Sequence, residues 1–202
     1  MVSVKYLYPR LSDKISKIKL DPIYFYQDVW CAKKIFENKP AHHYDIASSI
    51  KLVSIISQFC PVIFVDIRDI DLKLENLNVG ITDTRSLPFQ ENSIDSLSSM
   101  CVLEHIGLGR YGDEIDPDGT EKAVIEIKRV LKLEGNLYIS LPVDKENIFY
   151  FNAHRAFTRD YILSLFKELK LIEEKYIYDN QIYNNYETEK GFGTGLFCFK
   201  KL

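Results

Sequence analysis

Residues 82–106, TDTRSLPFQENSIDSLSSMCVLEHI, and residues 126–142, EIKRVLKLEGNLYISLP, contain the pattern that decides the fold. In the first stretch, the residues from Ser93 onward are typical of a buried strand that ends in a loop. The second stretch completes a helix that we expect to begin at Thr120, with Gly135 as its C-terminal cap. It then enters a strand that stops at Pro142. Strands and helices in this alternation are typical of a parallel sheet.

The rest of the chain extends this alternation in both directions. Apolar residues at helical spacing predict a helix over residues 50–59, and Thr158 is placed to cap another helix. The sequence therefore predicts a doubly wound α/β fold, with a mainly parallel seven-stranded sheet, helices on both faces and a C-terminal antiparallel strand pair. The expected strands lie at residues 42–47, 62–69, 78–83, 93–100, 136–143, 171–180 and 195–202.

Length and composition bound the class of protein. A chain of 202 residues is the size of one domain, and 46% hydrophobic with 27% charged residues is typical of a globular protein rather than a disordered one. We expect residues 41–202 to form this domain and residues 1–40 to be an extension packed on it. With a net charge of −3, no signal peptide and no long apolar run, we expect a soluble cytoplasmic protein that binds no nucleic acid and has no membrane span.

Three aspartates stand at or just beyond the ends of consecutive predicted strands: Asp45, Asp66 and Asp83. In an open parallel sheet, ligands bind beyond the carboxyl ends of the strands. Carboxylates there are suited to accept hydrogen bonds from the hydroxyls and the exocyclic amine of a nucleoside. A single aspartate at a strand end is more often a turn former, but three in one sheet favour a binding site.

The two opening stretches resemble the class I S-adenosylmethionine-dependent methyltransferase superfamily. Members carry an acidic residue before an LPF run, as at Asp83 and residues 87–89, and then an S-F-D motif, as at residues 93–95. The motif LEH follows at residues 103–105, and a helix end similar to RVLKPGG begins at residue 129. The resemblance covers roughly residues 43–200. Residues 105–119 together with residues 152–155 resemble a less characterised branch, some members of which are associated with surface glycans.

This resemblance implies S-adenosylmethionine as the cofactor. Asp66 would accept both ribose hydroxyls and Asp83 the adenine amine, while the loop after Asp45 would face the methionine end. The cofactor-binding residues implied in this way are Asp45, Ala47, Ser48, Ser49, Asp66, Ile67, Asp83, Thr84, Met100 and Cys101.

The loop after the first strand departs from the family pattern. The usual motif D-x-G-x-G-x-G lets the backbone approach the ligand closely, but here its glycine positions are Ala47, Ser49 and Lys51. Ser48 or Ser49 is suited to cap the following helix. Two hypotheses are compatible with this loop: a cofactor site with a modified cradle, or a methyltransferase-like domain that has lost catalysis.

Two histidines and a glutamate are the candidate catalytic residues. An unperturbed imidazole titrates near neutral pH, so His105 and His154 could accept a proton from an acceptor hydroxyl, with Glu104 orienting the His105 ring. For both histidines a structural role is the alternative. Arg110, Tyr111 and Arg155 lie in predicted loops and are the candidate substrate-binding residues.

We expect no metal site. Residues 114–119 imitate half of a calcium-binding loop, but Ile125 stands where the closing bidentate glutamate would be required. Residues 116–119 are typical of a turn.

These observations lead to two functional hypotheses. The first is an S-adenosylmethionine-dependent methyltransferase that acts on a small-molecule or saccharide acceptor. The second is a catalytically inactive binding or assembly protein. Either is compatible with a homo-oligomer.

Overall fold

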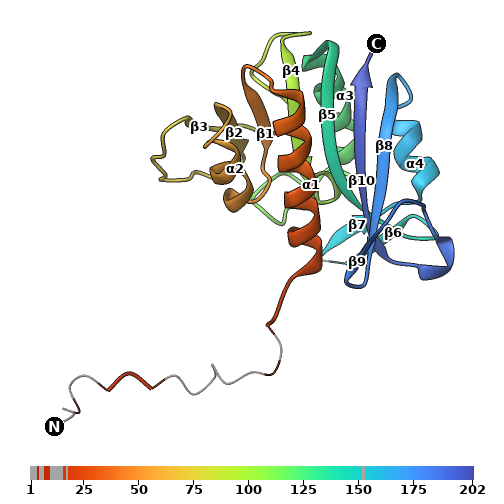
Figure 1. Ribbon diagram of the computed structural model, residues 1–202. Coiled ribbons are helices and arrows are strands. Elements are labelled where there is room, and N and C mark those ends of the chain that lie inside the picture. Colours follow the sequence, from red (N-terminus) through yellow and green to blue (C-terminus); the bar gives the residue numbers. More distant parts are fainter. Residues whose placement is uncertain (1–3, 5–6, 10–15, 17, 152) are drawn as a thin grey trace.

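The computed structural model describes residues 4, 7–9, 16, 18–151 and 153–202. Eight strands form one sheet, in the order β3-β2-β1-β4-β5-β10-β8-β9 (Figure 1). The strands β1 to β5 are parallel to one another, while β10 is antiparallel to both β5 and β8. The bounds are β1 His43–Ile46, β2 Val62–Asp66, β3 Leu77–Ile81, β4 Ile94–Met100, β5 Leu131–Val143, β8 Leu169–Tyr178, β9 Gln181–Tyr183 and β10 Gly193–Lys201.

This sheet confirms the predicted α/β class, the parallel majority and the C-terminal antiparallel pair, β8 and β10. It differs from the prediction by an eighth, three-residue strand, β9, that extends the edge beside β8. A separate hairpin of β6 (Ile148–Tyr150) and β7 (His154–Ala156) was also not predicted, because its strands are only three residues long.

Helices cover both faces of the sheet (Figure 1). The helices α1 (Pro22–Asn38) and α2 (Ile50–Ile56) lie on one face, and α3 (Gly119–Val130) and α4 (Arg159–Leu165) lie on the other. Thr158 caps α4 as predicted, since its hydroxyl accepts a hydrogen bond from the Tyr161 amide. Two short 3-10 turns, η2 (Leu103–His105) and η3 (Thr188–Lys190), complete the elements.

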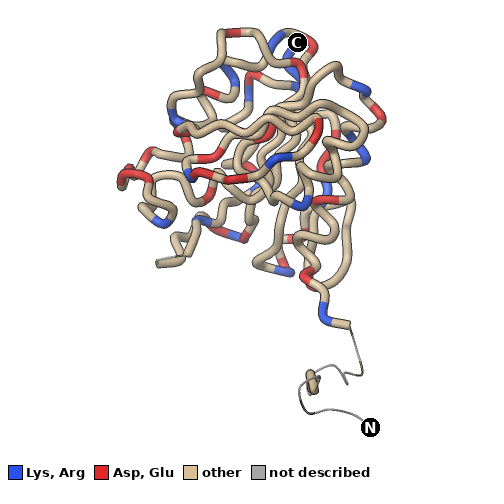
Figure 2. The backbone as a smooth tube through the Cα atoms, turned by 90° about the vertical axis from the view of Figure 1, so that its left-hand side faces the viewer, with Lys and Arg blue, Asp and Glu red and all other residues tan. Residues whose placement is uncertain are grey.

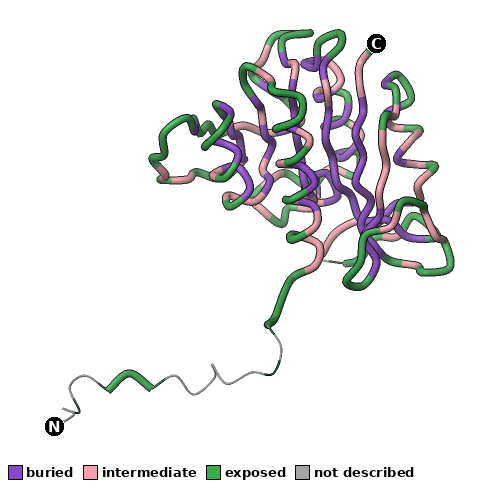
Figure 3. The backbone as a smooth tube through the Cα atoms, viewed as in Figure 1, coloured by how far each residue is buried: buried purple, intermediate pink, exposed green. Residues whose placement is uncertain are grey.

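The alternation of side chains along the central strands builds two apolar cores. Tyr138 of β5 packs on the α1 and α2 face, whereas its neighbours Leu137 and Ile139 pack on the α3 and α4 face. Figure 3 shows the result as a continuous buried band through the middle of the sheet. Central strands buried on both faces are the expected consequence of a parallel sheet covered by helices.

The end of α3 differs from the sequence-based expectation. Gly135 is not a helix cap, because α3 ends at Val130 and Leu131 begins β5 with no loop between them. Gly135 instead lies where the pairing of β4 with β5 shifts register. A Cβ on it would lie 2.8 Å from the carbonyl oxygen of Lys132 in β5 and 3.0 Å from that of Ile94 in β4, so the crowding of backbone at this point accounts for the glycine.

Charged residues are interspersed over the surface. Figure 2 shows basic and acidic positions mixed along the backbone, in keeping with the net charge of −3. Within the part of the chain that the structure describes, no helix has both the length and the apolar character needed to cross a membrane.

The N-terminal helix α1 packs on the sheet through one aromatic side chain. Asp21 caps α1, and Pro22 occupies the first turn, where proline is tolerated. Trp30 is buried, and its indole N–H donates to Glu173 Oε1 on β8 at 2.8 Å. Lys34, one turn later, donates to the other oxygen of Glu173 at 2.6 Å. The described residues before Asp21 are all exposed and lead away from the domain (Figure 1).

We expect Trp30→Ala to lower the free energy of unfolding by about 3–5 kcal/mol, because it removes a large buried side chain and leaves a cavity. Val29→Ala, the matched control on the exposed side of α1, should change it by less than about 0.5 kcal/mol. Urea denaturation followed by circular dichroism measures both values. Equal effects of the two variants would show that α1 does not depend on Trp30 for docking.

Candidate functional site

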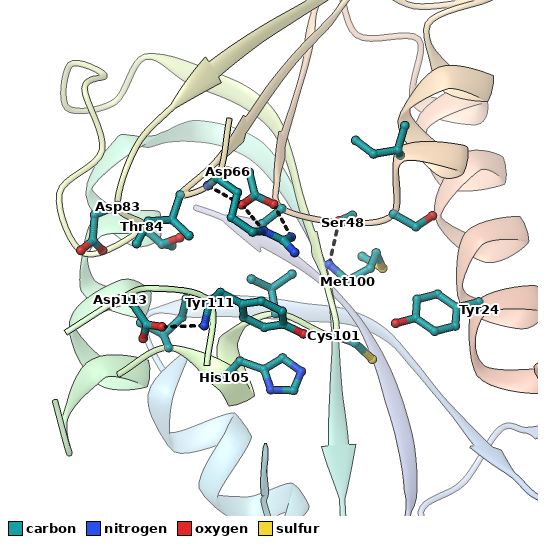
Figure 4. Close-up of a pocket in the computed structure, with 17 residues that line it drawn as sticks. Tyr24, Ser48, Asp66, Asp83, Thr84, Met100, Cys101, His105, Tyr111 and Asp113 are labelled. Carbon is teal, nitrogen blue, oxygen red and sulfur yellow. Dashed lines mark hydrogen bonds and ion pairs between the residues drawn. The ribbon is translucent and has the colours of Figure 1, made fainter. Parts of the chain in front are cut away.

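The carboxyl ends of the parallel strands open into one cavity. In the strand order 3-2-1-4-5, the chain leaves β1 and β4 in opposite directions, which is where open α/β sheets bind ligands. The cavity there has a volume of about 300 Å³, at the lower end of the range for small-molecule sites (Figure 4). It is lined by Tyr24, Ala47, Ser48, Ser49, Ile50, Asp66, Ile67, Arg68, Asp83, Thr84, Met100, Cys101, Val102, His105, Ile106, Tyr111 and Asp113.

The loop after β1 keeps the backbone shape of a glycine loop without a glycine. Ala47 has φ 53°, in the left-handed region that glycine adopts at little cost. The Ser48 hydroxyl accepts from the Met100 amide at 2.9 Å, which ties this loop to the end of β4. Ser49 caps α2 through the Leu52 amide at 3.1 Å. Ala47 therefore adopts the turn that a glycine would adopt, and it lines the cavity.

Asp45 stabilises this loop by hydrogen bonds and does not line the cavity. Its carboxylate is fully buried, and it accepts from the Ser48 amide at 3.0 Å and from the Ser98 hydroxyl. His43 in turn bonds Ser98 and Ser96, each at 2.8 Å. Burial raises the pKa of Asp45 to about 6, while the bonds from Ser98 and Ser48 oppose that shift. Asp45 thus supports the loop, and its side chain is not exposed to a ligand.

The carboxylate of Asp66, at the end of β2, accepts hydrogen bonds from Arg68, two residues later. Arg68 donates from its backbone amide and Nε to Oδ1 at 2.8 and 2.9 Å, and from Nη2 to Oδ2 at 2.7 Å (Figure 4). The Asp66 side chain is only 3% exposed. Ile67 between them lines the cavity.

Asp83, beyond β3, is bonded by an arginine at the same spacing but remains open. Arg85 donates to both its carboxylate oxygens, the shortest contact being 2.7 Å from Nη2 to Oδ2. These bonds lower the pKa of Asp83. The Asp83 side chain is still 34% exposed, and it lines the cavity beside Thr84.

Helix α1 forms the wall opposite Asp83, a contribution that the sequence did not reveal. Tyr24 reaches into the cavity from α1, across from Asp83 (Figure 4). Gln27 is fully buried, and its Oε1 accepts from the Cys101 thiol at 3.2 Å and from Ser140 at 2.8 Å. Asp28 accepts from the Ser49 hydroxyl at 3.0 Å. The loops that follow β1 and β4 are therefore both hydrogen-bonded to α1.

His105 and Glu104 place a proton acceptor and a proton donor side by side. With Nδ1 donating to the Ala153 carbonyl at 2.9 Å, Nε2 of His105 keeps its lone pair and lies 3.8 Å from Glu104 Oε1. Burial lowers the pKa of His105 to about 4 and raises the pKa of Glu104 to about 8. At neutral pH the proton thus resides on Glu104, and His105 is neutral. Only His105 of this pair lines the cavity.

Of the other residues predicted to bind substrate or to act in catalysis, some line the cavity and others pack behind its lining. Tyr111 lines the cavity and lies edge-on to His105 at 5.5 Å between ring centroids. His154 lies behind His105, packed on Tyr150 and Phe192 and outside the cavity lining. Asn152, two residues before His154, lies outside the described residues.

The two arginines predicted to lie in loops and bind substrate donate to backbone oxygens instead, and Arg155 lies on β7 rather than in a loop. Arg110 donates to the Ala153 carbonyl at 2.8 Å. Arg155 donates to the Ile106 carbonyl at 2.7 Å and to Thr120 Oγ1 at 3.2 Å, which fixes the loop before α3. Neither arginine lines the cavity.

Sequence reasoning missed several residues of the wall. Arg68 had a readable signal, since the pattern D-x-R occurs both at residues 66–68 and at residues 83–85. Tyr24 and Gln27 had none, because the packing of residues 22–38 on the sheet follows from tertiary contacts alone.

The chain has the fold of class I S-adenosylmethionine-dependent methyltransferases, as solved structures show. A putative sarcosine dimethylglycine methyltransferase from Galdieria sulphuraria matches with a TM-score of 0.65 and 15% identity, over 88% of this chain and 85% of that one. The 1,6-didemethyltoxoflavin-N1-methyltransferase from Burkholderia thailandensis, solved with S-adenosylhomocysteine, gives 0.62 and 14% over 89% and 83%. N-methyltransferase NodS from Bradyrhizobium japonicum, also with S-adenosylhomocysteine, gives 0.61 and 12% over 90% and 88%.

The chain belongs to the family DUF268, described as "Caenorhabditis protein of unknown function", whose model matches residues 81–186. That span is more than half of the chain. No curated protein matches the sequence.

We expect Ala47→Gly to raise the free energy of unfolding by about 1 kcal/mol, because glycine adopts the left-handed backbone without the Cβ clash. Ala123→Gly is the matched control, since Ala123 lies in the right-handed helix α3 and should lose about 1 kcal/mol. Thermal unfolding measures both. A loss of stability in Ala47→Gly would contradict the left-handed turn.

We expect Glu104→Gln to become more stable than the parent protein as the pH rises. The folded parent keeps its Glu104 proton up to a pKa of about 8, whereas an unfolded glutamate, with an ordinary pKa of 4.5, has already released it. The parent therefore loses stability between about pH 4.5 and pH 8, and glutamine does not. Urea denaturation at pH 5 and pH 9 should show a gain for the variant of roughly 3 kcal/mol or more at pH 9.

The exposed Glu114→Gln variant is the control and should follow the parent at both pH values. A Glu104→Gln variant that also follows the parent would show that Glu104 is ionised in the folded protein at neutral pH.

Proposed function

We propose that the protein binds S-adenosylmethionine in the cavity at the ends of β1 to β4 and transfers its methyl group to a small acceptor. The observation that carries this proposal is the convergence of the turn at Ala47 with Asp66, Asp83 and Met100 on one cavity at the strand-order reversal. The residues present fit the cofactor: the left-handed turn is kept, and Asp83 is partly exposed. The proteins of the same fold solved with S-adenosylhomocysteine support the proposal.

Each part of the wall has a proposed role in binding. The backbone of residues 47–49 holds the methionine end, Asp83 accepts from the adenine amine, and Asp66 accepts from the ribose hydroxyls. Met100 and Cys101 form the wall on the β4 side. When bound, S-adenosylmethionine supplies an electrophilic methyl carbon on a sulfonium, so alignment of the acceptor provides much of the rate.

His105 is the proposed proton acceptor. Its Nε2 carries a free lone pair, and its ring lines the cavity. An acceptor hydroxyl that loses its proton as the new bond to carbon forms would pass it to Nε2, which becomes an imidazolium beside Glu104.

The proposed acceptor is a small molecule with a nucleophilic hydroxyl, such as a saccharide. Tyr24 of α1 and Tyr111 both line the cavity and favour a compact acceptor. The saccharide preference rests on the resemblance of residues 105–119 to proteins associated with glycans.

A second candidate function is ligand binding without catalysis, and the Asp66–Arg68 ion pair is the observation that favours it. A carboxylate held by three hydrogen bonds from one arginine is not free for a ribose. In that case the protein would retain the methyltransferase fold as a binding or assembly domain.

Calorimetric titration with S-adenosylhomocysteine separates the two candidates. We expect binding tighter than about 1 mM, worth at least about 4 kcal/mol. Asp83→Asn should weaken it by about tenfold or more, since a hydrogen bond to a charged group contributes about 1.5–3 kcal/mol.

Asp95→Asn is the matched control, because Asp95 lies near the opposite end of β4 and should leave the affinity unchanged. No heat from the folded parent and its variants up to millimolar ligand would reject the methyltransferase proposal in favour of the second candidate.

A further inference from the structure

Arg68 covers the carboxylate that the proposed function assigns to the ribose. Within the described residues, Arg68 donates three hydrogen bonds to Asp66: its backbone amide and Nε donate to Oδ1, and Nη2 donates to Oδ2. The guanidinium is on the outside of the pair, since the Arg68 side chain is 52% exposed and the Asp66 side chain 3%. A ribose that approaches Asp66 through the cavity therefore meets Arg68 first.

The equivalent pair at Asp83 has a different construction. Arg85 is only 14% exposed, and besides Asp83 it bonds Asp116 and the Glu114 carbonyl oxygen at 3.3 and 3.4 Å. It therefore belongs to the fixed frame of the loop, while Asp83 stays open to the cavity. Among the described residues, Arg68 bonds no second carboxylate, so its guanidinium can leave Asp66 by side-chain rotation.

The second contact of Arg68 is aromatic. Its guanidinium carbon lies 4.6 Å from the centroid of the Tyr111 ring, and Tyr111 also lines the cavity. Such a stacked contact is weak at an exposed site and tolerates a change of position better than a two-pronged bond to a carboxylate does. Arg68 can keep part of this contact while Asp66 is released.

We propose that Arg68 competes with the ribose for Asp66 and thereby sets the affinity of the cavity for adenosine-bearing ligands. This inference rests on the proposed function, because it takes the ribose site to be at Asp66. Only molecules in which Arg68 has left Asp66 can bind the ribose. The apparent dissociation constant is therefore inversely proportional to the fraction of such molecules. Removing the guanidinium should tighten binding.

The competition has a distinctive dependence on salt. Arg68 is half exposed, so dissolved ions screen its attraction to Asp66, and higher ionic strength opens the pair. S-adenosylhomocysteine carries no net charge near neutral pH, so salt has little direct effect on its own attraction to the protein. The parent protein should therefore bind it more tightly at high salt, the reverse of the trend for a ligand held by charge attraction.

The experiment is calorimetric titration of S-adenosylhomocysteine into the full chain and its variants, at about 0.05 M and about 0.5 M salt. We expect Arg68→Ala to bind S-adenosylhomocysteine about tenfold more tightly than the parent does at low salt. The difference in affinity between the two proteins should be smaller at high salt. Arg68→Lys keeps the charge but loses the two-pronged bond, and it should fall between the two.

Arg159→Ala is the matched control. Arg159 also forms a two-pronged bond to a carboxylate, to Glu174 with both contacts at 2.9 Å, but it lies outside the cavity lining. Its removal should leave the affinity unchanged. Thermal unfolding of each variant checks that the compared samples are folded.

The outcomes distinguish this inference from the function on which it rests. A parent that binds while a folded Arg68→Ala binds equally or more weakly overturns the role of Arg68 and leaves the proposed cofactor in place. Binding by Arg68→Ala alone supports both. The absence of binding in both proteins, with both folded, overturns both.

Discussion

The buried carboxylate of Asp45 is the constraint on which the binding edge depends. It lies at the centre of the sheet, where β1 pairs with β2 on one side and β4 on the other. Its bonds to Ser98 and to the Ser48 amide fix the loop that follows β1 against the end of β4. A buried carboxylate is costly unless its hydrogen bonds are satisfied, and here His43 extends the network to Ser96. The same bonds that offset this cost shape the cavity.

Around that fixed point, the cavity wall combines rigid and movable parts. The turn at Ala47 is held by backbone and serine bonds, and Arg85 is anchored by several acceptors. Arg68 is held by one carboxylate and one ring. In the proposed function, the adenine side of the site is therefore preorganised, whereas the ribose side would exchange Arg68 for the ligand. Such a site would lose part of its intrinsic affinity to this internal competitor.

The sequence predicted the sheet well, because alternating buried strands and helices leave a strong periodic signal. It missed the bonds of Arg68 to Asp66, because the partner of a flexible side chain depends on its rotamer and not on its position in the chain. It also placed Gly135 wrongly as a helix cap, since a glycine after a helix and a glycine at a close strand contact look alike in a sequence. The contribution of α1 came only from tertiary packing through Trp30 and Gln27.

The docking of α1 has a consequence for how far the family match reaches. The match spans residues 81–186, whereas eight of the seventeen residues that line the cavity precede residue 81. These eight include Tyr24 on α1, the turn at Ala47 and the Asp66–Arg68 pair. A protein that shares only the matched span with this chain shares one side of the cavity and no more. A ligand preference in any other member of the family therefore has to be inferred from that member's own residues before the matched span.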